Sequence, residues 1–128
     1  MELLKSFLTG LCIMVASVPF GREYIMAGNG ESYFIEYYAS FAGFGLPLNL
    51  SQKIEKEMAE TGTAAYYRAE FDSGKKLVRV AKIYRGDLLF EHRYLYYPNG
   101  KLMRAEIRSN DGEFKVHEFD ASGNPKDQ

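Results

Sequence analysis

Two histidines and four glutamates are the side chains whose types and spacing could carry acid–base or metal chemistry. His92 and His117 are the only histidines among the 128 residues. The strand register predicted from the turns places them on opposite faces of one sheet, so we do not expect them to share a metal ion. The four glutamates are Glu70, Glu91, Glu106 and Glu118. Acid–base catalysis would need two of them to converge, yet each except Glu118 has a predicted cationic or histidine partner.

His92 is the strongest single candidate for a catalytic group, and its predicted neighbours argue against that role. Ala81 and Ile107 flank it across the adjacent strands, a setting that favours a core histidine bonded to a neighbour. The sequence also has no glycine-rich phosphate loop before a helix and no nucleophile elbow. We therefore predict a protein that is not an enzyme, with no catalytic residue, no metal ligand and no cofactor.

The hairpin that holds His92 is predicted over residues 88–109. Asn99-Gly100 stands between two alternating runs, and both residue types tolerate the positive φ of a type I′ turn. In the register set by a two-residue loop, two pairs of unlike charge lie directly opposite each other, which supports that register. They are Arg93 with Glu106 and Glu91 with Arg108.

Further strands precede and follow this hairpin, and their short turns allow only antiparallel neighbours. We take Gly86-Asp87 as the loop of the preceding hairpin, which places Ala81 opposite His92. One hairpin earlier, we predict a three-residue loop with Gly74 in a bulge. The five strands expected in this half of the chain are 64–71, 76–84, 88–97, 101–109 and 113–119.

These registers assign each apolar side chain to a face of the sheet, because successive strand residues alternate between faces. The predicted core face holds Tyr67, Ala69, Phe71, Leu77, Ala81, Ile83, Phe90, His92, Tyr94, Tyr96, Met103, Ala105, Ile107 and Val116. The opposite face collects Val78, Val80, Leu95, Tyr97, Leu102 and Phe119.

A helix is predicted to cover the core face. It begins after Asn49 or Ser51, runs to about Thr61, and ends at Gly62 in the left-handed conformation. An apolar stripe at four-residue spacing, formed by Leu50, Ile54 and Met58, would face the sheet. The expected fold class is α+β, an antiparallel meander of five to six strands with one covering helix and an N-terminal apolar segment.

Residues 7–20 form an uncharged apolar run behind Lys5, which matches a signal-peptide core better than a full membrane span. Three interpretations stay open: a cleaved signal, an uncleaved anchor starting near Leu3, or a buried helix of the fold. Lipidation is not expected, because Leu11 rather than a small residue precedes Cys12, the only cysteine.

The chain is thus predicted to comprise a signal peptide or anchor (1–20), a linker (21–31) and a single β-rich domain (32–128). We expect it in the bacterial cell envelope, periplasmic or membrane-anchored, with membrane contact through Leu3 to Phe20. The formal net charge of −1, with acids and bases interleaved, argues against a nucleic-acid partner.

Aromatic residues are the compositional excess, with ten Tyr and nine Phe. Those at the start of the body exceed what one helix stripe can cover, and aromatic side chains are enriched at interface hot spots. We expect them to bind a protein partner, which could belong to a larger membrane complex. The predicted partner-binding residues are Tyr33, Tyr37, Phe41 and Phe44.

An aromatic-turn-glycine phrase recurs about every twenty-five residues, beginning at Phe71, Tyr97 and Phe119. It resembles the YD-type and antitoxin-like β-hairpin repeats of bacterial proteins, in which each phrase closes one hairpin of an antiparallel array. The wider pattern from Tyr33 to Ile107 is similar to a family of small uncharacterised bacterial domains, and that resemblance implies no activity.

Two functions follow as expectations. The first is a non-catalytic, exported or membrane-anchored binding or accessory protein. The alternative is a small-ligand pocket protein, or a weak hydrolase, that uses a cleft between helix and sheet lined by Tyr67, His92, Tyr94 and Tyr96.

Overall fold

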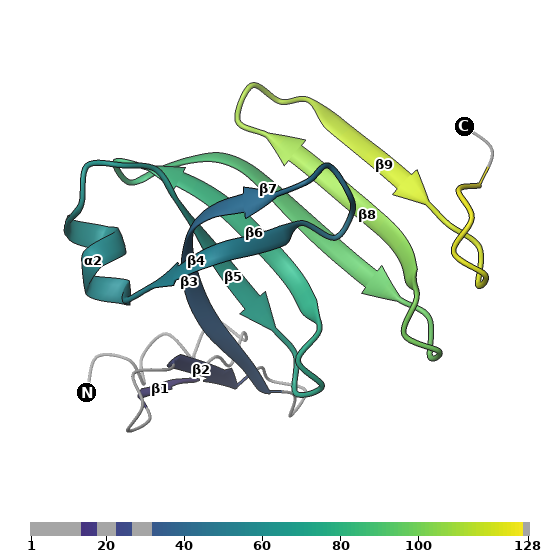
Figure 1. The fold of residues 1–128 in the computed structure, drawn as a ribbon, viewed down its shortest axis with the longest axis horizontal. Coiled ribbons are helices and arrows are strands. Elements are labelled where there is room, and N and C mark those ends of the chain that lie inside the picture. Colours follow the sequence, from purple (N-terminus) through teal and green to yellow (C-terminus); the bar gives the residue numbers. More distant parts are fainter. Residues whose placement is uncertain (1–13, 18–22, 27–31, 127–128) are drawn as a thin grey trace, which may run out of the picture.

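The computed structural model describes residues 14–17, 23–26 and 32–126, which form one antiparallel sheet and a short helix (Figure 1). The strand order is β1-β2-β3-β5-β6-β7-β8-β9, and β4 pairs with β3 outside this path. The strands are β1 (Met14–Ser17), β2 (Glu23–Met26), β3 (Ser32–Ala42), β4 (Asn49–Ile54), β5 (Tyr66–Phe71), β6 (Leu77–Tyr84), β7 (Asp87–Tyr96), β8 (Leu102–Ser109) and β9 (Phe114–Glu118). The helix is α2 (Lys56–Thr61).

The antiparallel α+β architecture is confirmed, but five to six strands was too low a count, since seven (β3 to β9) lie in the body that begins at Ser32. β1 and β2 extend the sheet beyond β3. They fall inside the segments 1–20 and 21–31, whose other residues lie outside the described ones, so that those boundaries stay predictions. No helix within the described residues has the length and apolarity to cross a bilayer.

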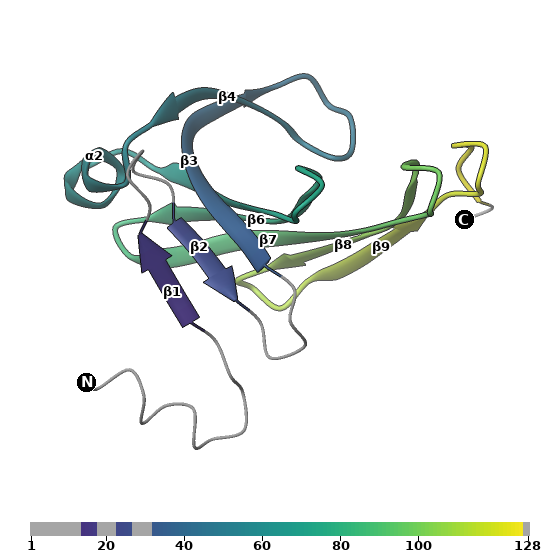
Figure 2. The same ribbon diagram turned by 90° about the horizontal axis from the view of Figure 1, so that it is seen from below.

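β3 changes partner along its length, and this shapes the molecule. On one edge, residues 32–35 pair with β2 and residues 37–42 pair with β4, while residues 34–38 pair with β5 on the other edge. The strand curves along its length, so that the β3–β4 hairpin lies over one face of the sheet (Figure 2). The hairpin supplies Leu46, Leu48 and Leu50 to the main core.

The predicted covering helix was wrong. Residues 49–54 form β4, α2 is limited to six residues that contact β3, and Met58 is 62% exposed. Gly62 is extended (φ −77°) rather than left-handed. The physical reason is the edge of β3 that β2 leaves free beyond Ile35, whose backbone N–H and C=O groups gain hydrogen-bond partners only if the next segment is a strand.

Three turn predictions also need correction. The loop after β7 has three residues, because Gly100 N–H donates to Tyr97 O (2.9 Å) and Tyr97 N–H donates to Lys101 O (2.8 Å). Gly100 alone has positive φ there, which makes it a bulge residue rather than half of a type I′ turn. The β7–β8 register is as predicted as far as Leu95, after which Tyr96 lies opposite Leu102 and not Met103.

The type I′ geometry occurs instead at Arg85-Gly86, where both residues have positive φ (50° and 84°). The loop therefore begins one residue earlier than the predicted Gly86-Asp87, which by itself would place Arg79 opposite His92. A bulge between Lys82 and Ile83 then shifts the pairing by one residue, so that Val80 rather than Ala81 lies opposite His92. This shift places Val80 in the core, where it is 0% exposed, and overturns its assignment to the opposite face.

The β5–β6 loop has the predicted length of three residues but lies one residue later, at Ser73-Gly74-Lys75, and Lys75 rather than Gly74 holds the positive φ (68°). A bulge between Glu70 and Phe71 shifts the pairing by one further residue, so that Ala69 lies opposite Val80 and not Leu77. The main core that results is small and contains Tyr67, Ala69, Leu77, Val80, Tyr94 and Ala105. A second cluster of Ile35, Tyr37 and Ala59 lies where α2 packs on β3.

Candidate functional site

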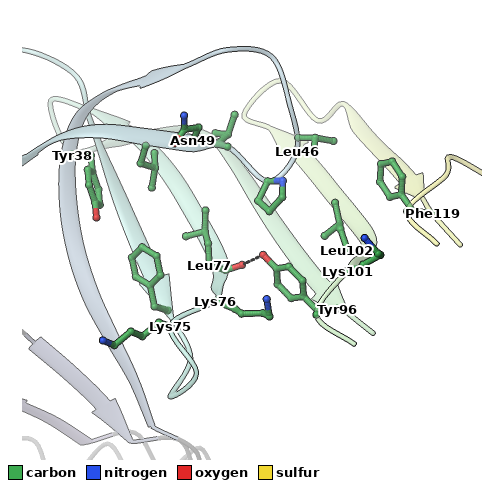
Figure 3. A pocket seen from close by; sticks show the side chains of 16 residues that line it. Tyr38, Leu46, Asn49, Lys75, Lys76, Leu77, Tyr96, Lys101, Leu102 and Phe119 are labelled. Atoms are coloured by element: carbon green, nitrogen blue, oxygen red, sulfur yellow. Dashed lines mark hydrogen bonds between the residues drawn. The ribbon is translucent and has the colours of Figure 1, made fainter. Parts of the chain in front are cut away.

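An open groove of about 700 Å³ lies between the β3–β4 hairpin and the sheet, and we call it the hairpin groove (Figure 3). The hairpin side is formed by Leu46, Leu48 and Leu50, and the sheet side by Phe71, Leu77, Tyr96 and Leu102. Three lysines, Lys75, Lys76 and Lys101, line it as well. The surface is thus apolar in its middle and cationic at one side.

The repeated aromatic-turn-glycine phrase builds that cationic side. Each phrase closes a three-residue turn, spanning Asp72 to Lys76, Tyr97 to Lys101 and Asp120 to Asn124. These turns lie at the same end of an antiparallel sheet, since a strand pair separates each from the next. Asn99 Nδ2 donates to Ala121 O (2.9 Å), which joins the second turn to the third.

Tyr94 and His92 hold the hairpin in place above the core. Leu48 N–H donates to Tyr94 Oη (3.1 Å), and Tyr94 Oη lies 2.8 Å from His92 Nδ1. Burial lowers the pKa of His92 to about 4 and raises the pKa of the Tyr94 hydroxyl well above its usual range. At neutral pH the imidazole is uncharged, and the tyrosine oxygen accepts from Leu48. The tautomer of the imidazole sets which of His92 Nδ1 and Tyr94 Oη donates in the hydrogen bond between them.

Tyr96 forms part of the groove surface in a fixed position. Its hydroxyl donates to Leu77 O (2.6 Å), and burial together with the charge of Asp72 raises its pKa to about 12. Lys76 Nζ lies 5.1 Å from the ring centroid, close enough for a cation–π contact. Figure 3 shows the Tyr96 ring between the side chains of Lys76 and Lys101.

The aromatic residues predicted to bind a partner differ in exposure. Tyr37 is buried in β3 and Tyr33 is half-buried. Phe41 is 39% exposed and makes an edge contact with the Tyr67 ring (5.6 Å between centroids), whereas Phe44 is fully exposed. The hairpin therefore presents Phe44 with part of Phe41, and Tyr37 is a core residue.

The two histidines lie on the same face of the sheet, which corrects the sequence analysis. His117 lies opposite Ala105, which in turn lies opposite Tyr94 on the face of His92. The β8–β9 register thus differs by one residue from that predicted, where His117 was opposite Glu106. No group of three or more His, Cys, Asp or Glu side chains that could hold a metal occurs in the part of the chain described.

The glutamates on the other face are engaged with arginines. Glu91 accepts from Arg79 Nε (2.8 Å) and from Arg93 Nε, and Glu70 accepts from Arg79 Nη1 (2.6 Å). The hydrogen bond from Arg79 is the main cause that lowers the pKa of Glu91 to about 2. A carboxylate held ionised in this way is a poor general base near neutral pH.

The predicted cross-strand ion pairs are confirmed in backbone register but not in side-chain contact. Arg93 lies opposite Glu106, yet Arg93 binds Glu91 on its own strand. Glu106 likewise accepts from Arg104, two residues away on β8 (2.8 Å). Charges on this face therefore pair along strands as well as across them.

Sequence reasoning missed the groove lysines, although the repeated phrase carried a signal for them. Lys76 and Lys101 occupy the same position, directly after the three-residue loop, in two of the three phrases. Alignment of the phrases by their turns would have placed both ammonium groups at one end of the sheet. The hairpin side of the groove had no such signal, because it depended on the wrong helix prediction.

The fold and the groove define a small antiparallel β protein with an apolar, cation-lined surface groove. The chain belongs to the family of unknown function DUF6156, which matches residues 31–128. No curated protein and no solved structure matches the chain. Membership of an uncharacterised domain family is thus confirmed, while the likeness to YD-type or antitoxin-like repeats stays a prediction.

Proposed function

We propose that this protein is a non-catalytic binding protein of the bacterial cell envelope that docks on a protein partner through the β3–β4 hairpin. The observation that carries the proposal is the full exposure of Phe44 beside the partly exposed Phe41. Burial of a solvent-exposed loop phenylalanine by a partner makes the free energy of binding more favourable, and aromatic anchors dominate many interfaces. Tyr33 and Tyr37 then serve to hold β3 rather than to touch the partner.

The envelope location rests on the apolar run 7–20 alone. Val15 and Ser17 are small enough to precede a cleavage point. N-terminal sequencing of the protein from native membranes and periplasm distinguishes a cleaved signal from a retained anchor. An intact N-terminus in the soluble cytoplasmic fraction would contradict the envelope location.

A photo-crosslinking phenylalanine analogue at position 44 tests the docking. We expect a discrete crosslinked product from living cells, identified by mass spectrometry and absent when Phe41→Ser weakens the site. The matched control carries the same analogue at position 114, because Phe114 is also exposed (45%) but lies on β9. An identical pattern of products at positions 44 and 114 would contradict docking through the hairpin.

Stability must be followed alongside binding. Phe44→Ser should leave the free energy of unfolding within about 0.5 kcal/mol, because the side chain is exposed and surface changes rarely matter more. Phe41→Ser removes a ring contact with Tyr67 and should cost about 1 kcal/mol. Loss of the crosslink without loss of folding then reports on the interface.

A second candidate function, the binding of a small ligand, is favoured by the hairpin groove. Of the four residues that the sequence analysis expected in a pocket, Tyr96 lines this groove, whereas Tyr67, His92 and Tyr94 are buried in the core. The groove adjoins the hairpin and not the helix. The chemistry of its lining indicates what such a ligand would be.

A further inference from the structure

We infer that the hairpin groove binds a single-chain anionic amphiphile, of which a fatty acid such as laurate is the representative. The alkyl chain would lie between the leucines of the hairpin and those of the sheet, and the carboxylate would lie at the lysines. This site is separate from the docking residue Phe44, which is not among the residues that line the groove.

The size and surface of the groove suit an alkyl chain. Its volume, about 700 Å³, is within the range of small-molecule sites. Leu46 and Leu50 face it from the hairpin and Leu77 and Leu102 from the sheet, so that a chain is enclosed by apolar surface from both sides. The gap between Leu46 and Leu102 is visible in Figure 3.

The charged side chains that line the groove are cationic. Lys75, Lys76 and Lys101 line it, and no Asp or Glu among the described residues does. Among the described residues none of these lysines forms an ion pair. The nearest acids in sequence, Asp72 and Asp120, use Oδ1 to accept backbone N–H groups of their own turns. An anionic group is the complement of this edge.

The polar groups of the groove exclude a ligand that needs many directed hydrogen bonds. Tyr96 Oη donates to Leu77 O, and Tyr38 Oη donates to Glu36 Oε1 (2.7 Å). Asn49 is the one other polar side chain, apart from the lysines, that lines the groove within the described residues. Recognition must therefore rest on apolar contact and on charge, which an amphiphile with a simple anionic head satisfies.

Calorimetric titration of the full chain with laurate tests the inference. We expect one site, with dodecyltrimethylammonium, which has the same chain length but a positive head, binding at least tenfold more weakly. Butyrate and inorganic sulfate should show no saturable binding at the same concentrations. Equal affinity for the cationic surfactant would reveal an apolar patch only, and equal affinity for butyrate or sulfate a simple anion site; either result overturns the proposal.

Variants locate the site. Lys76→Gln with Lys101→Gln should weaken laurate about tenfold, since each exposed charge contributes up to about 1 kcal/mol and about 1.4 kcal/mol is tenfold. The matched control, Lys53→Gln with Lys115→Gln, removes two exposed lysines that do not line the groove and should leave the affinity unchanged. Phe44→Ser should also bind laurate normally, which separates this site from partner docking. Equal weakening by both lysine pairs would contradict a site at the groove.

Methyl resonances provide an independent readout. Laurate should shift the methyl signals of Leu46 and Leu102, which line the groove, and leave those of the exposed Leu95 unchanged. Shifts confined to Leu95 would show that the fatty acid binds elsewhere and would overturn the proposal.

Discussion

The two faces of the β5–β8 sheet hold the antiparallel strands together by different interactions. On the face beneath the β3–β4 hairpin, Val80 and Ala105 are 0% exposed, and the polar atoms of His92 and Tyr94 bind each other. On the other face, Arg79 lies between two glutamates and binds both. The first face is held by burial and the second by ionised groups that remain partly hydrated.

The comparison shows how much depends on register. Residues 79 and 80 are neighbours in β6, yet one is an arginine in an ion-pair network and the other a fully buried valine. Because successive side chains of a strand lie on opposite faces of the sheet, a register shift of one residue would exchange these two environments completely. On both faces the polar groups are satisfied, because no buried side-chain N or O among the described residues lacks a hydrogen-bond partner.

The largest effect should come from a charge placed on the buried face. Val80→Asp should destabilise the fold by about 4 kcal/mol or more, because the carboxylate would be enclosed without a partner. Val78→Asp, two residues earlier on the same strand and half-buried, should cost about 1 kcal/mol. Urea unfolding measures both, and similar midpoints would mean that β6 does not have the register described.

On the charged face, Glu91→Gln should cost about 3 kcal/mol, since it leaves Arg79 with one carboxylate partner and removes the negative charge that pairs with Arg93. Glu106→Gln, at a more exposed pair with Arg104, should cost under about 1 kcal/mol. The pKa of Glu91 is lowered to about 2, so its stabilisation is present above pH 4.5 and is lost as the pH falls toward 2. A Glu91→Gln protein with an unchanged urea midpoint would exclude this role.

The buried face should also lose stability as the pH falls, but through His92, for which folding favours the neutral form rather than the ionised form. In the unfolded chain this histidine takes up a proton near pH 6.5, but in the folded protein only near pH 4. The unfolded state therefore binds more protons between these values, and stability should fall by about 2 kcal/mol as the pH drops from 6.5 to 4. His92→Gln should flatten the slope of the unfolding free energy between pH 6.5 and 5. An unchanged slope in this variant would argue against His92.

The smallest expected effect tests which side chains form ion pairs on the charged face. A double-mutant cycle with Arg93→Ala and Glu106→Ala should give a coupling under about 0.3 kcal/mol, because each side chain binds a partner on its own strand. The cycle with Arg93→Ala and Glu91→Ala should give about 0.5–1 kcal/mol. The reverse order of the two couplings would mean that the charges pair across the strands in solution.

The sequence by itself determined the antiparallel meander after residue 64 and most of the β7–β8 register. Short turns between alternating runs leave few other topologies, and the opposed charges of Arg93 and Glu106 select one register. The aromatic-turn-glycine phrase also marked the ends of three strands correctly. These features are local, so residues close in the chain carry the whole signal.

The tertiary structure alone decided what covers the sheet and which side chains meet at the groove. Leu50, Ile54 and Met58 have the spacing of a helix, but β4 pairs with the free edge of β3 and overrides that pattern. The bulge between Lys82 and Ile83, which follows the turn at Arg85-Gly86, shifted the register by one residue and moved Val80 into the core. Both outcomes depend on hydrogen bonds or packing with segments elsewhere in the fold, which a pattern within one segment does not encode.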